Sequence, residues 1–102
     1  MVDDGSPDGT KAAALAYGVR MGGVALTVIR QDNAGAGAAR NRGMMEARTN
    51  FVAFLDADDE WLPKKLARCM ARLVNSETVL VAHDSFAVSD GRETRLNCAS
   101  RF

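Results

Sequence analysis

Residues 51–60 read Phe-Val-Ala-Phe-Leu-Asp-Ala-Asp-Asp-Glu, an apolar run that ends in a cluster of carboxylates. The run over 51–55 contains no polar residue, which is typical of a strand buried on both faces of a parallel sheet. Open α/β sheets bind ligands in the crevice beyond the carboxyl ends of their strands. Because the four acids repel one another, their placement favours a cation held there, with a polyanion bound through it.

Helix and strand signals alternate along the rest of the chain. Apolar residues at helical spacing predict helices, and β-branched runs predict strands. We expect helices over about 11–20, 38–48 and 62–73, strands over 24–29, 51–55 and 78–82, and a hairpin or edge strand from 85 onward. Thr10 is the predicted N-cap of the first helix, and Gly43 interrupts the second at a cost of ~1 kcal/mol relative to Ala. This alternation predicts an α/β unit with a largely parallel sheet.

Length and charge set the class of protein. The 102 residues suffice for one small domain or a piece of a larger one, and thirteen basic residues balance thirteen acidic ones. No global field therefore draws the protein to nucleic acid or anionic lipid. Ten of the basic residues are Arg, which favours bidentate contacts with phosphate or carboxylate. We expect one partial domain over 1–102 and no nucleic-acid partner.

Targeting signals and cysteines give little. No apolar stretch approaches the ~18 to 20 residues of a membrane span, and the first residues resemble neither a signal nor a transit peptide. Cys69 and Cys98 do not make a disulfide framework, and Cys69 fits a buried apolar helix position. The expected location is the cytoplasm.

The first acidic pair, Asp3 and Asp4, also resembles the end of a strand. Only two residues precede the pair, and the turn Gly-Ser-Pro-Asp-Gly over 5–9 follows it. The strand that should lead into this turn is missing. We therefore expect the chain to be cut from a longer protein.

Three segments, at 2–10 (VDDGSPDGT), 33–43 (NAG, then ARNRG) and 54–59 (FLDADD), line up in order and spacing with one family. They resemble the inverting family 2 glycosyltransferases of GT-A fold, from residue 2 to about residue 75. The resemblance implies a partial GT-A sheet (Rossmann-like, of the nucleotide-diphospho-sugar transferase type) with flanking helices. It also implies that the first strand and the acceptor-binding half are absent.

The resemblance implies a role for each matching residue at the donor site. Asp4 would help to hold the base or ribose, and Asp3 would support the turn. Asp56 would accept a ribose hydroxyl, and Arg40 would lie near the nucleotide. Asp58 would ligate a Mn²⁺ or Mg²⁺ ion that bridges the two phosphates.

Elementary chemistry supports this assignment. A departing diphosphate develops negative charge, which a hard divalent ion with oxygen ligands neutralises without a proton donor. One or two carboxylates and the substrate phosphates commonly hold Mg²⁺, so Asp58 and one neighbour suffice; Asp59 is the weaker candidate. An ionised carboxylate is also a strong acceptor for a ribose hydroxyl.

The implied reaction moves a sugar from a nucleotide-diphosphate donor, UDP-linked by resemblance, to a saccharide or lipid-linked acceptor. The catalytic base of the family, an acidic residue downstream of the Asp-x-Asp segment, has no counterpart after residue 75. We expect the chain alone to bind nucleotide weakly, to be inactive and marginally stable, and to self-associate through exposed sheet edges. The parent protein would associate with the inner face of the membrane.

Other interpretations of the same residues stay open. The chain could be a non-catalytic metal- or nucleotide-binding module of the same fold, or a nucleotidyltransferase, although the Gly-rich loop near the start of that class is not seen. The acidic cluster alone could be the solvated start of a helix. A calcium loop fails, because Trp61 and Ala67 stand where Gly and Glu are needed. His83, the single histidine, is interpreted as structural.

Overall fold

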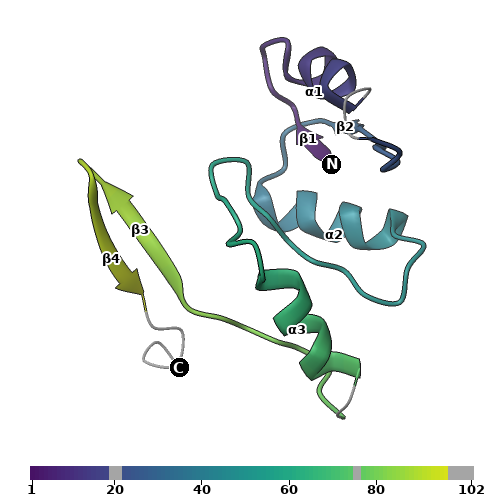
Figure 1. Ribbon diagram of the computed structural model, residues 1–102. Coiled ribbons are helices and arrows are strands. Elements are labelled where there is room, and N and C mark those ends of the chain that lie inside the picture. The colour runs from purple at the N-terminus through teal and green to yellow at the C-terminus, as the bar shows by residue number, and fades with distance from the viewer. Residues whose placement is uncertain (19–21, 75–76, 97–102) are drawn as a thin grey trace. The chain divides into compact units, whose positions relative to one another are not determined.

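The computed structural model describes residues 1–18, 22–74 and 77–96 (Figure 1). The chain divides into two compact units, Met1–Asp56 and Ala57–Phe102. The described residues form three helices, a parallel strand pair and an antiparallel hairpin. The α/β prediction is therefore confirmed at this level, whereas the strand order of a GT-A sheet stays a prediction.

The first unit is built around two short parallel strands. It contains β1 (Val2–Asp4), α1 (Thr10–Gly18), β2 (Ile29–Gln31) and α2 (Ala36–Glu46). In the β1–β2 pair Asp4 lies opposite Gln31, so both strands end at the same edge. Helix α2 packs against β1, as Figure 1 shows.

Helix α1 begins one residue earlier than predicted, and its cap differs. Thr10 is the first helical residue, and the first backbone bond runs from the Ala13 N–H to the Gly9 carbonyl at 2.9 Å. The Asp8 carboxylate accepts hydrogen bonds from the Thr10 N–H, at 3.0 Å, and from the Thr10 hydroxyl. The prediction of Thr10 as N-cap is wrong, because Asp8 supplies the acceptor. The predicted end of this helix near residue 20 lies outside the described residues.

The predicted central strand over 51–55 is wrong. This segment is neither helix nor strand, and its large apolar side chains are 44–49% exposed. A parallel strand is stable only beside a partner that satisfies its N–H and C=O groups. Among the described residues the only parallel partners are β1 and β2, and these pair with each other.

The same constraint corrects the other two predicted strands. Residues 78–82 form no strand, and Val79 is 96% exposed. The strand expected over 24–29 is instead β2, because β1 offers hydrogen-bonding groups opposite residues 29–31 alone. Apolar, β-branched sequence therefore did not suffice where no neighbouring strand pairs with it.

Helix α2 starts two residues before the predicted start and continues through Gly43. A Cβ at Gly43 would lie 3.6 Å from Val2 Cγ2, an ordinary packing distance. Arg42 Nε donates to Glu46 Oε1 at 2.9 Å, an exposed pair one turn apart. Arg42 is thus a structural residue of the helix surface, as expected.

The second unit contains α3 (Lys65–Val74), β3 (Ser85–Ser89) and β4 (Arg92–Leu96). The hairpin prediction is confirmed: the strands pair antiparallel around Asp90 and Gly91, whose φ angles are 50° and 73°. Two positive φ angles are what a two-residue hairpin turn requires. Cys69 is half-buried on α3, whereas Cys98 lies outside the described residues.

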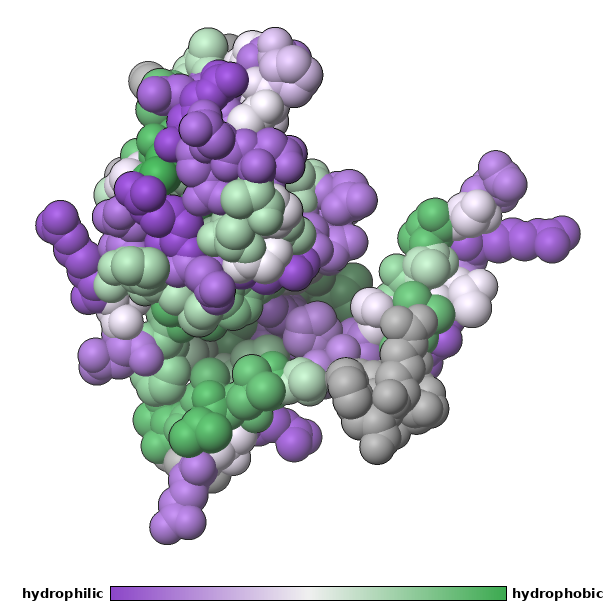
Figure 2. All heavy atoms as spheres, turned by 180° about the vertical axis from the view of Figure 1, so that it is seen from behind, coloured by the Kyte–Doolittle hydropathy of each residue, from purple (hydrophilic) through white to green (hydrophobic). Residues whose placement is uncertain are grey.

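Burial is confined to one residue of the described chain. Asp3 is 2% exposed, and no hydrophobic side chain in the described ranges is buried. Figure 2 shows a hydrophobic area at its lower left, in the part of the chain that holds α3. Its second unit has exposed apolar residues including Leu62, Leu66 and Val74. No described helix has the length and apolar character needed to cross a membrane.

Two glycines of the first unit give a matched test of this packing. Gly5 has φ 79°, and a Cβ there would lie 2.9 Å from the Asn33 backbone nitrogen. We expect Gly5→Ala to lower the free energy of unfolding by about 1–3 kcal/mol, because backbone must move. Gly43→Ala should raise it by up to ~1 kcal/mol, since the site is helical and roomy. Urea unfolding followed by circular dichroism measures both, and equal midpoints for the two variants would contradict the expected clash.

Candidate functional site

Asp3 holds the turn that follows β1. Its Oδ1 accepts the Ser6 N–H at 2.9 Å, while its buried Oδ2 has no hydrogen-bond partner. The nearest cation is Arg30, with Nη1 3.8 Å from Oδ2 and Nη2 donating to the Ser6 carbonyl at 2.9 Å. Hydrogen bonds from the Ser6 hydroxyl and amide lower the pKa of Asp3, and they outweigh the opposing effect of burial. Asp3 is therefore an ionised, inward-facing part of the turn.

Asp4 connects the two strand ends to the start of α2. Its carboxylate accepts three hydrogen bonds, from Gln31 Nε2 at 2.7 Å, the Ala34 N–H at 3.0 Å and the Gly35 N–H at 2.8 Å. The Ala34 amide, followed by the Gln31 amide, lowers the pKa of Asp4. Gly35 is the N-cap of α2 and has φ 89°, a conformation that favours glycine. One carboxylate thus fixes the carboxyl edge of the β1–β2 pair.

Two other predicted site residues are brought together. Arg40, on α2, directs Nη2 to both oxygens of Asp56, at 2.9 Å and 2.7 Å. The two side chains are 45% and 50% exposed, so the pair is open to solvent and to a ligand. An exposed ion pair of this kind contributes about 0–1 kcal/mol to stability. Stability alone therefore gives little reason for the pairing.

The acids that follow lie in an irregular segment of the second unit. Asp58, Asp59 and Glu60 are exposed, and Asp58 sits in a turn. Helix α3 begins at Lys65 and has no acid in its first turn, so the interpretation of the cluster as a helix start is wrong. The position of Asp58 relative to the residues of the first unit stays a prediction.

A divalent ion fits the chemistry of this segment, although the protein does not supply a full shell. In the described ranges, no three His, Cys, Asp or Glu side chains gather into a group that could hold a metal. The Asp58 carboxylate has no protein partner among the described residues. A free hard-oxygen donor of this kind suits Mg²⁺ or Mn²⁺ when substrate phosphates and water complete the shell.

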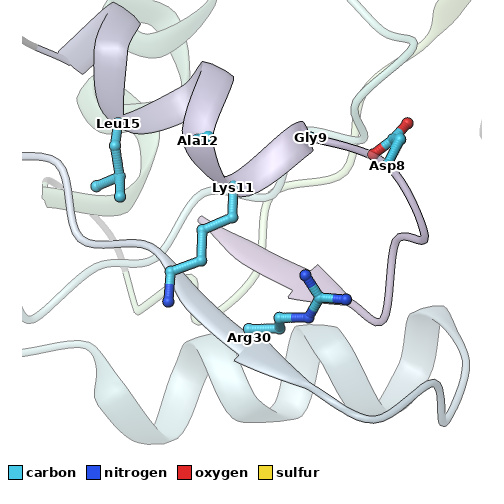
Figure 3. Close-up of a pocket in the computed structure, with 6 residues that line it drawn as sticks. All are labelled: Asp8, Gly9, Lys11, Ala12, Leu15 and Arg30. Atoms are coloured by element: carbon cyan, nitrogen blue, oxygen red, sulfur yellow. The ribbon is translucent and has the colours of Figure 1, made fainter.

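A shallow hollow lies elsewhere on the first unit. It is bordered by α1, β2 and the turn before α1, with Lys11, Leu15 and Arg30 among its lining residues (Figure 3). Neither Asp4 nor Gln31 lines it. The hollow is therefore separate from the edge at which the strands end.

Sequence reasoning missed Gln31, which it placed in a polar loop. The residue is the last of β2 and lies opposite Asp4 in the parallel pair. The available signal was a polar residue directly after a β-branched run, at the position where a strand ends. Locating that end required the register with β1.

Comparison with known proteins identifies one family across nearly the whole chain. The family described as "Glycosyl transferase family 2" matches residues 1–99. An uncharacterized glycosyltransferase of Nostoc sp. is 36% identical over 98% of this chain. The amylovoran biosynthesis glycosyltransferase AmsB of Erwinia amylovora is 37% identical over 76% of it, and the succinoglycan biosynthesis protein ExoO of Rhizobium meliloti is 36% identical over 94%.

The match covers a minor part of these relatives. The chain spans 30% of the Nostoc protein, 26% of AmsB and 27% of ExoO. No solved structure gives a significant match.

The hydrogen bonds to Asp3 and Asp4 predict an acid-sensitive site. Both pKa values lie below the ordinary 3.8. The stability that these carboxylates contribute is therefore complete above about pH 4 and is lost as the pH falls through their folded pKa values. Proton NMR shifts of the Ala34 and Gly35 amides, followed from pH 6 to pH 2, should change with a midpoint below 3.8.

Asp4→Asn is the control, because its amide does not titrate and the transition at the Ala34 and Gly35 amides should vanish. Asp8→Asn should leave that transition in place, since Asp8 contacts Thr10 instead. A midpoint above the ordinary value in the unmodified protein would contradict the assigned role of these bonds.

Proposed function

Because this chain belongs to glycosyl transferase family 2, we propose that it forms the donor-binding part of an enzyme that transfers a sugar from a nucleotide diphosphate to an acceptor hydroxyl, with inversion. The observation that supports this most is the organised carboxyl edge of β1 and β2, where Asp4 joins Gln31 to the start of α2. Such edges are where open α/β sheets bind nucleotides. The acid-rich motifs lie at or after this edge.

Asp4 and the Arg40–Asp56 pair would contact the nucleoside. A carboxylate has about four lone-pair sites, and Asp4 uses three of them within the protein. One site is left for a hydroxyl or N–H of the base or ribose. Asp56 would accept a ribose hydroxyl while its pairing with Arg40 fixes the orientation of the carboxylate. Asp3 would act indirectly, through the turn that it holds.

Asp58 would hold the divalent cation, Mn²⁺ or Mg²⁺. Its exposed carboxylate is a hard oxygen donor in a turn. When bound, such an ion neutralises charge on the departing diphosphate. The residues of this chain would position the nucleotide and supply the oxygen ligand.

The transfer itself would be a direct displacement. The acceptor hydroxyl gives its proton to a base and bonds to the anomeric carbon, as the bond from that carbon to the diphosphate oxygen breaks. None of the described residues is assigned as this base, and we propose that the chain alone is inactive. The names of AmsB and ExoO, which refer to amylovoran and succinoglycan biosynthesis, support a saccharide acceptor. UDP is the proposed donor nucleotide.

Titration with UDP, with and without Mn²⁺, tests the donor site. Trp61, the single tryptophan, follows the acidic segment directly and reports through its fluorescence. We expect a saturable change that requires the metal, because the diphosphate would bind through the ion. Absence of any change in a folded chain would reject a donor site in residues 1–102.

Asp58 and Asp59 provide a matched pair of variants for the metal site. Asp58→Ala should weaken UDP binding in Mn²⁺ by about tenfold or more, equivalent to about 1.4 kcal/mol, because the ion loses its protein ligand. Asp59→Ala removes the same charge from the adjacent position and should change the affinity by less than about threefold. Calorimetric titration of both variants gives the comparison. Equal losses would assign the effect to net charge rather than to ligation.

A further inference from the structure

Gln31 has an amide whose orientation is fixed by chemistry. Its Nε2 donates to Asp4 Oδ1 at 2.7 Å. An ionised carboxylate accepts hydrogen bonds only, so the nitrogen and not the oxygen must face Asp4. The Gln31 Oε1 is thereby held as an acceptor, and it has no hydrogen-bond partner among the described residues.

The support behind this amide is also fixed. Asp4 is held by the Ala34 and Gly35 N–H groups, so it cannot rotate away without breaking backbone hydrogen bonds. A free surface glutamine can present either its nitrogen or its oxygen to a ligand. Because rotation of the Gln31 amide would set its oxygen against the Asp4 carboxylate, Gln31 can only accept. A locked acceptor can discriminate between ligands that offer a donor and ligands that offer a lone pair.

The position of this acceptor relates it to a nucleotide. Gln31 is half-buried and ends β2, at the same strand edge as Asp4. The bases of pyrimidine nucleotides differ in one ring atom that bears on this group. Uracil carries an N3–H donor, whereas cytosine has a lone pair at N3. An acceptor would bond to the first and oppose the second.

We propose that Gln31 Oε1 accepts the ring N–H of the donor base and so selects uracil over cytosine. This assignment rests on the proposed donor-binding function and adds the residue that determines nucleotide specificity. Asp4 is the other acceptor at the edge, but three of its lone-pair sites are already used within the protein. In this arrangement Asp4 is a positioning residue for the base-reading amide.

The test compares UDP with N3-methyl-UDP, which lacks the ring N–H, by calorimetry in Mn²⁺. The variant is Gln31→Lys, whose ammonium still donates to Asp4 but offers no acceptor. In the unmodified protein, methylation should weaken binding about tenfold, and CDP should be about tenfold weaker than UDP. In Gln31→Lys the UDP affinity should fall to that of the methylated ligand, and both preferences should shrink below about threefold.

The outcomes separate this inference from the function on which it rests. Equal affinities of the unmodified protein for UDP and N3-methyl-UDP would overturn the inference, and this arm needs no variant. A methylation penalty that persists in Gln31→Lys would also overturn it, by placing the N–H on another acceptor. Failure of the unmodified protein to bind any nucleotide would instead overturn the donor-site function, and the inference with it. Unchanged NMR shifts of the Ala34 and Gly35 amides show that the lysine variant keeps the contacts of Asp4.

Discussion

The three hydrogen bonds accepted by Asp4 are the constraint on which the organised part of this protein depends. They join the end of β1 to the end of β2 and to the N-cap of α2, segments that lie 27 to 31 residues apart in the chain. The strands have three residues each, so backbone pairing alone gives a short ladder. A charged acceptor for two backbone amides adds hydrogen bonds stronger than neutral ones. The carboxyl edge is therefore fixed by side-chain chemistry as much as by the sheet.

The neighbouring carboxylate, Asp3, has a different task because strand residues alternate in direction. Asp3 is buried in the turn, beside Arg30, whereas Asp4 is half-buried at the edge. Both are held in the ionised form by hydrogen bonds. This division separates turn support from edge organisation, although the residues are adjacent in sequence. It explains how a pair of like charges persists with little space between them.

In a family 2 glycosyl transferase, this arrangement suits recognition of a nucleotide more directly than it suits bond making. The described polar groups accept or donate hydrogen bonds in fixed orientations, as Gln31 and the Arg40–Asp56 pair illustrate. Fixed partners lose less conformational freedom on binding, which favours affinity and specificity. The exposed acids from Asp58 onward add hard oxygen donors suited to a divalent ion.

Local sequence determined the helices, the hairpin turn at Asp90-Gly91 and the motifs that identify the family, because these depend on residues a few positions apart. It also singled out Arg40 and Asp56, although not their contact. The tertiary structure alone decided which apolar runs become strands: residues 51–55 have strand-like sequence but lie beside no described partner. It alone decided that Asp4 holds Gln31 and Gly35. The physical reason is that hydrogen-bond partners distant in the chain are chosen by register and packing, which no local pattern encodes.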